Sequence, residues 1–458
     1  MLSRAVCFII MPFGQKPDAA GQLVDFDAVF REIIAPAVEQ AGLAGVRADE
    51  EMGSGIIHKL MYERLLLSDY AVADLSIMNA NVYYELGIRH AVRPASTVLL
   101  AASASRLPFD LGPTRALPYA LDPGGRPKDA ATASAAVRDE LNHCRQHYDV
   151  DSPLFQLLQG YKAPPIDHLK TDTFREQVAI ANETREKLRL ARGQGVEALD
   201  AVRGELGDIG TTEAGITVDL LLSYRAIGHW QRMVDVYRQM DPALARTVLV
   251  REQYAFALNR LGRGEEAEKE LKDIIKERGP SSETYGLLGR VYKDRWQAAR
   301  TAGATVAARG HLRKAIDAYR LGFEADWRDA YPGINAVTLM SILNPADPAI
   351  ASLATVVRYS IERRMSARGM GDYWDHATIV ELSVMQNDWD RAEVALSDAI
   401  VAMRETWEAD TTANNLRMIE TARREASQDT DRLAMLIDEL MTGKQHLAEK
   451  LEAITKAR

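Results

Sequence analysis

Residues 70–75 read Tyr-Ala-Val-Ala-Asp-Leu, and residues 79–87 continue with Asn-Ala-Asn-Val-Tyr-Tyr-Glu-Leu-Gly. The first stretch has the length and apolar character of a buried β-strand, and the second, after a polar loop, begins a helix. A strand followed by a helix is the repeating unit of a parallel α/β sheet. This stretch therefore predicts the fold class of the first part of the chain.

The same alternation extends over the first 150 residues. The apolar run at residues 5–11 is typical of a central strand buried on both faces, and it ends in a turn signal at residues 12–14. We expect further strands at 46–49, 97–101 and 116–121, and helices at 25–41, 56–67, 81–93 and 131–148. Together these elements predict a doubly wound, mostly parallel sheet.

A second pattern begins near residue 173, where strand signals almost disappear and helical patterns follow one another. The equivalent positions Met233 and Ala267 lie 34 residues apart, which is the period of tetratricopeptide repeats. The next equivalent position, Ala315, follows after 48 residues, so we place a 14-residue insertion near residues 296–310. An all-α repeat array is therefore expected.

The predicted division of the chain has four parts. They are an α/β domain (1–150), a connection (151–172), helical repeats (173–410) and charged capping helices (411–458). A length of 458 residues is too great for one core and agrees with several domains.

Composition excludes several classes of protein. The net charge of −9 argues against binding of nucleic acid by bulk electrostatics. Two cysteines, Cys7 and Cys144, exclude a disulfide framework and a cysteine-based zinc site and suit a reducing cytoplasm. Cys7 lies in an apolar run, so we expect a buried thiol. With no signal peptide and no apolar stretch of about 18 residues, we expect a cytoplasmic protein that does not interact with membranes.

Two carboxylates mark a candidate catalytic site. Ligands of open α/β sheets bind at the carboxyl edge of the strands, where Asp74 ends its strand. Glu85 lies about one turn into the next helix, near the same crevice. A carboxylate there can attack an anomeric carbon or stabilise an oxocarbenium ion. Alternatively, Glu85 is a first-turn acid that interacts with the helix dipole.

Nucleotide-binding candidates surround this edge. Gly53 and Ser54 begin a helix, and their backbone N–H groups either hold a phosphate or form an ordinary cap. Phe13 and Gly14 either line the pocket floor or form a simple turn. His58 and His90 each lie on an expected helix without a partner at metal-ligand spacing, so we expect no metal site.

Charged and aromatic candidates complete the set. Arg47, Asp49 and Glu50 either contact ribose or phosphate or form an exposed salt-bridge cluster. Tyr84 and its neighbour Tyr83 either stack on a base or pack in the core.

The segment from Phe8 to about Leu100 resembles the nucleoside 2-deoxyribosyltransferase-like family, which is related in fold to TIR domains. The matching motifs are residues 8–14, 47–50, 73–76 and the Asn-x-Asn-Val-x-Tyr-Glu-Leu-Gly stretch at 79–87. The resemblance implies a TIR- or flavodoxin-like fold. It also implies that the glutamate attacks the sugar or, as in catalytic TIR domains, cleaves the nicotinamide–ribose bond of NAD.

Asn79 departs from the pattern of the transferases, in which an aspartate commonly precedes the glutamate by six residues. An amide cannot act as a carboxylate base, which argues against deoxyribosyl transfer and leaves N-glycoside hydrolysis open. In that reaction the resemblance gives Glu85 the role of nucleophile, while Asp74 and Asn81 orient the ribose hydroxyls.

A second resemblance covers most of the remainder. The strings Gly289-Arg-Val-Tyr-Lys-Asp294, Ala315-Ile-Asp-Ala-Tyr-Arg-Leu-Gly-Phe-Glu324 and Tyr331-Pro-Gly-Ile-Asn-Ala336 are similar to the TRAF-binding regulatory region of apoptosis signal-regulating kinases. That region also joins a TIR-like domain to tetratricopeptide-type helices. No set of kinase motifs occurs up to Arg458, so we expect the regulatory module alone.

Two functions in signalling or defence are compatible with these patterns. The first is an oligomeric nucleotide N-glycosidase, with NAD or another nucleotide as substrate rather than cofactor, controlled by the repeats. The second is a non-catalytic nucleotide sensor or scaffold whose repeat groove binds a partner protein. We expect a homo-oligomer in either case.

Overall fold

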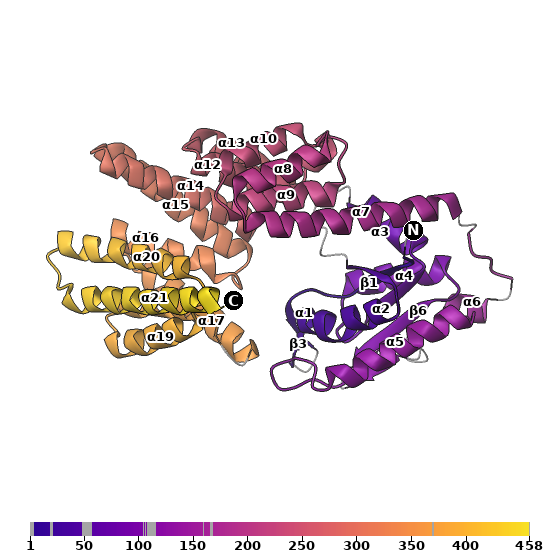
Figure 1. Cartoon of the computed structure of the whole chain (residues 1–458). Coiled ribbons are helices and arrows are strands. Elements are labelled where there is room, and N and C mark those ends of the chain that lie inside the picture. Colours follow the sequence, from indigo (N-terminus) through magenta and orange to yellow (C-terminus); the bar gives the residue numbers. More distant parts are fainter. Residues whose placement is uncertain are drawn as a thin grey trace. The chain divides into compact units, whose positions relative to one another are not determined.

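The computed structural model describes residues 4–18, 22–47, 57–103, 105, 107, 116–158, 160–164, 168–368 and 371–457. The chain forms two compact units, Met1–Ala257 and Leu258–Arg458. In Figure 1 the first unit runs from indigo to magenta and contains the sheet, and the second runs to yellow and is helical. The predicted fold class, an α/β part followed by a tetratricopeptide-like helical array, is confirmed.

Five parallel strands form the sheet of the first unit, in the order β4-β1-β5-β6-β7. Their bounds are β1 (Val6–Ile10), β4 (Ala44–Arg47), β5 (Tyr70–Asp74), β6 (Thr97–Ala102) and β7 (Ala116–Tyr119). Apart from a small separate hairpin, this is the 2-1-3-4-5 order of flavodoxin-type sheets, in which ligands bind where the order reverses, between β1 and β5. Each of the five predicted strand segments therefore overlaps an observed strand, and residues 48 and 49 of the segment 46–49 lie outside the described residues.

Both faces of the sheet are covered, which explains the continuous apolar run of β1. Cys7 and Ile9 lie in the core on one face, whereas Val6, Phe8 and Ile10 lie in the core on the other. The first face packs against α1 (Phe26–Val29), η1 (Phe30–Ile34), α2 (Ala35–Gln40) and α5 (Ala130–Gln146). The second packs against α3 (Ile57–Leu67), α4 (Ala80–Val92) and part of α7 (His168–Arg192). The predicted burial of Cys7 is confirmed.

Two local features differ from the sequence prediction. The helix expected at 25–41 is interrupted by the π-helical turn η1, which ends two residues before Pro36. Proline lacks the backbone N–H that would donate to the carbonyl oxygen of Glu32 in a regular helix. A two-stranded hairpin, β2 (Gln15–Pro17) with β3 (Leu23–Asp25), was not predicted. Its first strand is polar and exposed, so it lacks the alternation that marks a strand.

Helix α7 belongs to both parts of the first unit. Phe174 and Val178 are buried in the sheet core, and Leu188 and Ala191 are buried farther along, where α7 packs against α8 and α9. The segment expected to be a connection therefore contains the short helix α6 (Pro153–Leu157) and the beginning of α7. The sheet and the first helical hairpins form one compact unit because they share this helix.

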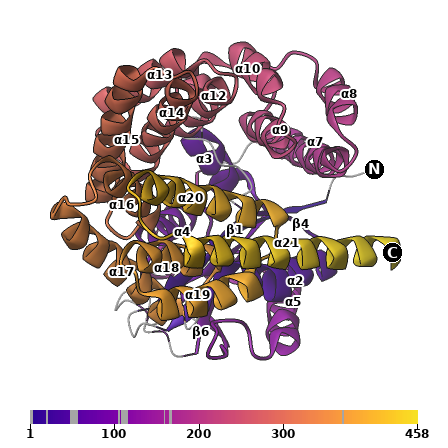
Figure 2. The same cartoon turned by 90° about the vertical axis from the view of Figure 1, so that its left-hand side faces the viewer.

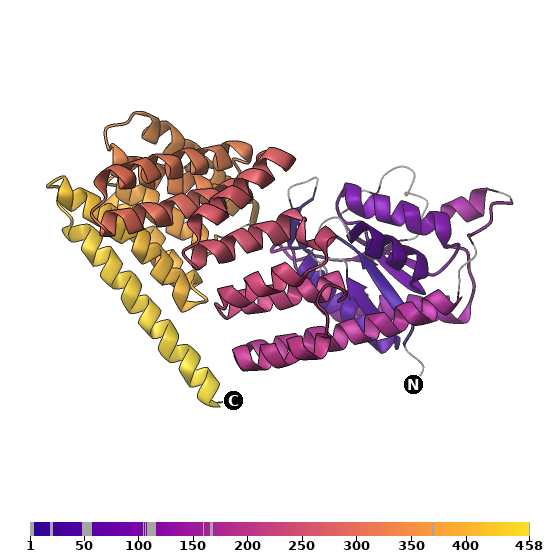
Figure 3. The same cartoon turned by 90° about the horizontal axis from the view of Figure 1, so that it is seen from above.

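The helices come in consecutive antiparallel pairs, as the 34-residue period predicts. The first unit contains α8 (Val196–Leu206), α9 (Ala214–Ala226), α10 (Trp230–Gln239) and α11 (Pro242–Ala245), and the chain leaves it in α12 (Val248–Arg260). The second contains α13 (Gly264–Arg278), α14 (Ser282–Thr301), α15 (Thr305–Ala325), α16 (Ala330–Leu343), α17 (Ala349–Arg368), α18 (Tyr373–Met385), α19 (Trp389–Ala402), α20 (Thr406–Glu425) and α21 (Asp431–Ala457). Figure 2 shows the later pairs following one another, and Figure 3 shows α21 in yellow, at the end of the chain.

The insertion near residues 296–310 falls within the pair α14–α15. These helices have 20 and 21 residues, against 13 and 15 in α12 and α13. Seven and six added residues lengthen the two helices by about 1.9 and about 1.7 turns, so both helices of the pair grow by similar amounts. The insertion therefore extends the hairpin instead of forming a loop.

Close helix approach in this pair depends on Gly289. A Cβ atom added there would lie 2.7 Å from the ring of Tyr319, which is completely buried on α15. Both residues lie in the strings that carry the kinase resemblance. The ring therefore occupies the space of the missing side chain.

We predict that Gly289→Ala lowers the free energy of unfolding by about 1–2 kcal/mol, because overpacking costs about 1–3 kcal/mol and exceeds the helix-propensity gain of about 1 kcal/mol. Gly310→Ala on α15 is the control, since its added Cβ meets no atom within 4 Å. It should raise the stability by about 0.5–1 kcal/mol. Chemical denaturation measures both, and an equal effect of the two substitutions would contradict this packing.

Candidate functional site

The predicted site lies where β1 and β5 end, at the reversal of strand order. Phe13 and Gly14 follow β1, and Asp74, Asn79 and Glu85 lie at the end of β5 and on α4. The remaining nucleotide-binding candidates Asp49, Gly53 and Ser54, together with Glu50, lie outside the described residues.

Asp74 is completely buried and accepts two hydrogen bonds. The Ser76 backbone N–H donates to Oδ1 at 2.8 Å, and the Tyr119 hydroxyl donates to Oδ2 at 2.8 Å. Burial raises the pKa of Asp74, although the bonds from Ser76 and Tyr119 oppose this effect. The Ser76 hydroxyl also lies 2.8 Å from that of Tyr119 and accepts from the Ala102 N–H. Asp74 therefore joins the ends of β5, β6 and β7.

Asn79 is the N-cap of α4. Its side-chain oxygen accepts hydrogen bonds from the backbone N–H groups of Asn81 at 3.0 Å and Val82 at 3.3 Å. Asn and Asp are about equally good N-caps, so this position has a structural requirement that an amide fulfils. Asn81 itself is exposed in the first turn of the helix.

Glu85 is partly buried on α4, and no described residue forms a hydrogen bond or ion pair with its carboxylate. Burial raises the pKa of Glu85 from 4.5 to about 7. It is the sixth residue of the helix, beyond the first turn in which the dipole stabilises an acid, so the dipole alternative does not account for it. An unpaired carboxylate that titrates near neutral pH can serve as an acid, base or nucleophile.

A buried arginine positions α4, and sequence reasoning missed it. Arg89 has no exposed surface and donates to the carbonyl oxygens of Leu65 at 3.0 Å and Ser68 at 2.8 Å, at the end of α3. It also donates to the hydroxyls of Ser96 and Thr97, and burial lowers its pKa to about 9. The only sequence signal for this role was the place of Arg89 on the apolar face of α4, one turn after Glu85. Asn79 and Arg89 thus fix both ends of the helix that carries Glu85.

The tyrosines beside Glu85 have separate environments. Tyr84 is 56% exposed, and its hydroxyl lies 2.9 Å from that of Tyr62 on α3. Tyr83 is partly buried against the sheet core, and its hydroxyl has no hydrogen-bond partner within the described part of the chain. Tyr84 is the one of the pair whose ring is available to a ligand.

The turn after β1 is held by an ion pair. The guanidinium of Arg47 donates to Asp27 at 2.8 Å and to the Pro12 carbonyl at 3.2 Å, and it lies 5.1 Å from the centre of the Phe13 ring. Gly14 has φ +63° and donates its N–H to Asp27 at 3.3 Å. Although partial burial opposes it, hydrogen bonds from Arg47 and Gly14 lower the pKa of Asp27. Arg47 is thus buried, not part of an exposed cluster.

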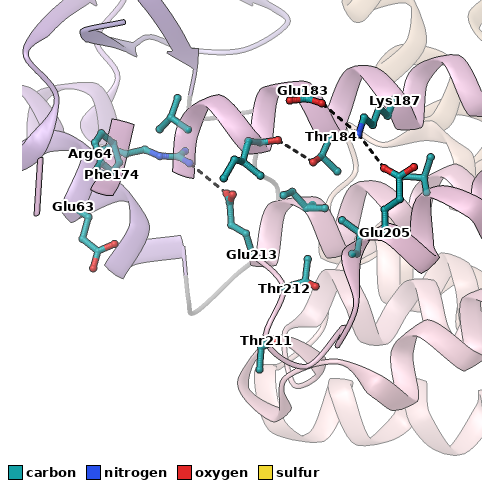
Figure 4. A pocket seen from close by; sticks show the side chains of 15 residues that line it. Glu63, Arg64, Phe174, Glu183, Thr184, Lys187, Glu205, Thr211, Thr212 and Glu213 are labelled. Carbon is teal, nitrogen blue, oxygen red and sulfur yellow. Dashed lines mark hydrogen bonds and ion pairs between the residues drawn. The ribbon is translucent and has the colours of Figure 1, made fainter. Parts of the chain in front are cut away.

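Apart from the sheet edge, a cavity of about 680 Å³ lies between α3 and helices α7 to α9 (Figure 4). The nearly buried Arg64 of α3 points toward Glu213, which begins α9, at 3.5 Å. On another side Lys187 pairs with Glu205 at 2.9 Å and with Glu183 at 3.3 Å. The pairs Arg64–Glu213 and Lys187–Glu205 cross-link the elements around the cavity.

The fold and these sites define an α/β sheet domain joined to helical hairpins of tetratricopeptide type. Residues 82–438 match the profile of the MAP3K TRAFs-binding domain. The chain belongs to the MAP3K TRAFs-binding domain family, and the resemblance of the repeat region to that part of the kinases is confirmed.

Curated relatives are much longer kinases. The chain is 28% identical to mitogen-activated protein kinase kinase kinase nsy-1 of Caenorhabditis elegans, over 53% of this chain and 18% of the relative. It is 24% identical to mitogen-activated protein kinase kinase kinase 15 of Mus musculus, over 80% of this chain and 29% of the relative. The chain thus spans less than a third of these relatives.

Solved structures with similar helices include two tetratricopeptide proteins. One, from Parabacteroides merdae, covers 61% of this chain and 98% of its own, with 14% identity and a TM-score of 0.36. Another, from Thermus thermophilus, covers 44% of this chain and 99% of its own, with 13% identity and a TM-score of 0.34.

Two features are absent from the part of the chain that the structure describes. No helix there is both long enough and apolar enough to cross a membrane. Within the same residues, no three His, Cys, Asp or Glu side chains gather in a way that suits a metal ion.

Proposed function

We propose that this chain is a signalling module whose helical hairpins bind TRAF adaptor proteins. The observation that carries the proposal is the family match over residues 82–438, which includes every helix from α5 to α20. Arrays of helical hairpins commonly present extended surfaces to protein partners. The family is described as a TRAFs-binding domain, and this description suggests TRAF proteins as the class of partner.

A row of exposed aromatic side chains supports protein binding by the second unit. Tyr331, Trp374 and Trp407 are each the second residue of a hairpin's first helix, in α16, α18 and α20. They are 49%, 37% and 56% exposed, and the rings of Trp374 and Trp407 lie 5.6 Å apart. Exposed Trp and Tyr dominate the energy of many protein interfaces. We name these three residues the aromatic row and propose it as part of the adaptor-binding surface.

We predict that Trp374→Ala with Trp407→Ala weakens the binding of a TRAF adaptor at least tenfold, because both rings lose their interface contacts. Isothermal titration calorimetry of the full chain measures the dissociation constant. Tyr359→Ala, a 55% exposed aromatic on α17, is the control and should change it less than twofold. Equal affinities of the wild type and the double variant, with unchanged circular dichroism, would contradict the role of the aromatic row.

A second proposal concerns the sheet edge, where a TIR-like domain would bind and cleave a nucleotide N-glycosidic bond such as that of NAD. It rests on Glu85, whose carboxylate lacks a described partner and has a pKa of about 7. Tyr84 and Asn81 lie exposed on the same helix and would contact the nucleotide. Asp74 gives the proposal less support, because its carboxylate already accepts hydrogen bonds from Ser76 and Tyr119. Self-association would complete the site.

We predict that any NAD cleavage rises with pH through about 7, where the rate is half-maximal, and levels at higher pH, since the attacking Glu85 must be ionised and its pKa is about 7. Glu85→Gln should lower the rate at least 100-fold, while Glu140→Gln on α5, an exposed acid, should not change it. Release of nicotinamide by purified full chain measures the rate. Equal rates for the wild type and Glu85→Gln would remove Glu85 from the mechanism, and bound but uncleaved nucleotide would identify a sensor.

A further inference from the structure

A charged cavity of about 450 Å³ lies between α14 and α20, within the second unit. Arg290, Lys293 and Arg300 of α14 line it, together with Asn414, Asn415 and Arg417 of α20. The two helices are more than 100 residues apart in sequence. The cavity belongs neither to the sheet edge nor to the aromatic row.

Two lining residues of the cavity, Lys293 and Asn415, belong to a buried polar network that we call the floor. The ammonium of Lys293, only 5% exposed, donates to the side-chain oxygens of Asn335 at 3.1 Å and Asn415 at 3.0 Å. The Asn415 amide donates to Glu381 at 2.9 Å, and the Thr338 hydroxyl donates to the other oxygen of Glu381 at 3.2 Å. Burial lowers the pKa of Lys293 to about 8. The floor is rigid because its members come from α14, α16, α18 and α20.

The walls are two parallel stripes of side chains. On α14 the lining residues recur every three or four positions from 290 to 300, and on α20 they do so from 411 to 421. Further contacts hold the helices side by side, since Gln297 donates to the sulfur of Met418 at 3.3 Å and Arg300 pairs with Glu425 at 2.6 Å. A helix rises about 1.5 Å per residue, so each stripe is about 15 Å long.

The lining is basic, in contrast to the chain as a whole. Among the described lining residues are four cations, Arg290, Lys293, Arg300 and Arg417, and one carboxylate, Asp294. Asp294 pairs with Arg290 at 2.9 Å, and Glu425, outside the lining, pairs with Arg300. The whole chain has a net charge of −9. The neutral lining residues in the described part of the chain are amides, threonines and one methionine, and none of them offers an aromatic ring for a nucleotide base to stack on. The site therefore selects an anion with hydrogen-bonding groups.

We propose that this cavity binds an acidic segment of a partner protein. Arg417, together with Arg300 in exchange for Glu425, pairs with its Asp or Glu carboxylates, and the amides and threonines bond to its backbone. An extended peptide advances about 3.3 Å per residue, so the stripe accommodates four or five residues. A single phosphate ion would span only a fraction of that length. The inference deepens the proposed function, because it gives the chemistry of one part of the partner.

The test uses the full chain and a fluorescein-labelled peptide, Glu-Asp-Glu-Asp-Glu-Asp, with fluorescence anisotropy as the readout. We expect the wild type to bind, with an affinity that falls as salt is raised. The double variant R300E/R417E, which reverses the two exposed cations of the cavity, should bind at least tenfold more weakly. The control R309E/R313E makes the same charge change on exposed positions of α15 and should bind within twofold of the wild type. If R300E/R417E fails to fold, R300Q/R417Q replaces it.

Several results would overturn the inference. They are equal losses in the two double variants, equal binding of a Gln-Asn-Gln-Asn-Gln-Asn peptide, and no binding by the wild type. Binding of a phosphoserine peptide at least tenfold tighter than the acidic peptide would overturn it in favour of a phosphate site. TRAF adaptor binding is measured on the same samples. If the acidic peptide does not bind the cavity while the adaptor still binds the chain, this inference is refuted and the proposed function stands.

Discussion

The second unit depends on one buried network, in which Lys293 and Glu381 are joined through the amide of Asn415. Removing a single member of a buried charged pair leaves the other uncompensated, at a cost of about 3–5 kcal/mol. The network fixes the spacing of α14, α16, α18 and α20, the first helices of four successive hairpins. These same helices present the aromatic row and the basic cavity, so both proposed binding surfaces depend on the same buried bonds.

The first unit has a corresponding constraint around α4. The Asn79 cap and the buried Arg89 hold this helix between the ends of β5 and α3, and Glu85 lies between these two anchors. Helix α7 then joins the sheet to the first hairpins through Phe174 and Val178. The family match begins at Val82, inside α4, so it includes part of the sheet domain as well as the repeats. The α/β part is structurally continuous with the module that defines the family.

Local patterns predicted most of this architecture, because the periodic spacing of apolar residues can be recognised within a contiguous stretch of sequence. The run at residues 5–11 indicated a strand buried on both faces, and the 34-residue period indicated the repeats. The bonds that organise the candidate sites could not be predicted in this way. Tyr119 reaches Asp74 from 45 residues away, and Asn415 reaches Lys293 from 122 residues away. No local signal distinguishes such partners from other polar side chains. The hairpin β2–β3 was missed for a different reason, because its polar, exposed first strand lacks the alternation that marks a strand.

The central claim is that the helical array, not the sheet edge, binds the signalling partner. Hydrogen–deuterium exchange of the full chain, with and without a saturating TRAF adaptor, tests it most directly, because backbone amides at an interface exchange more slowly when they are covered. The account predicts slower exchange at the beginnings of α16, α18 and α20 and unchanged exchange in α4. Slower exchange in α3 and α4, with no change in those three helices, would contradict it.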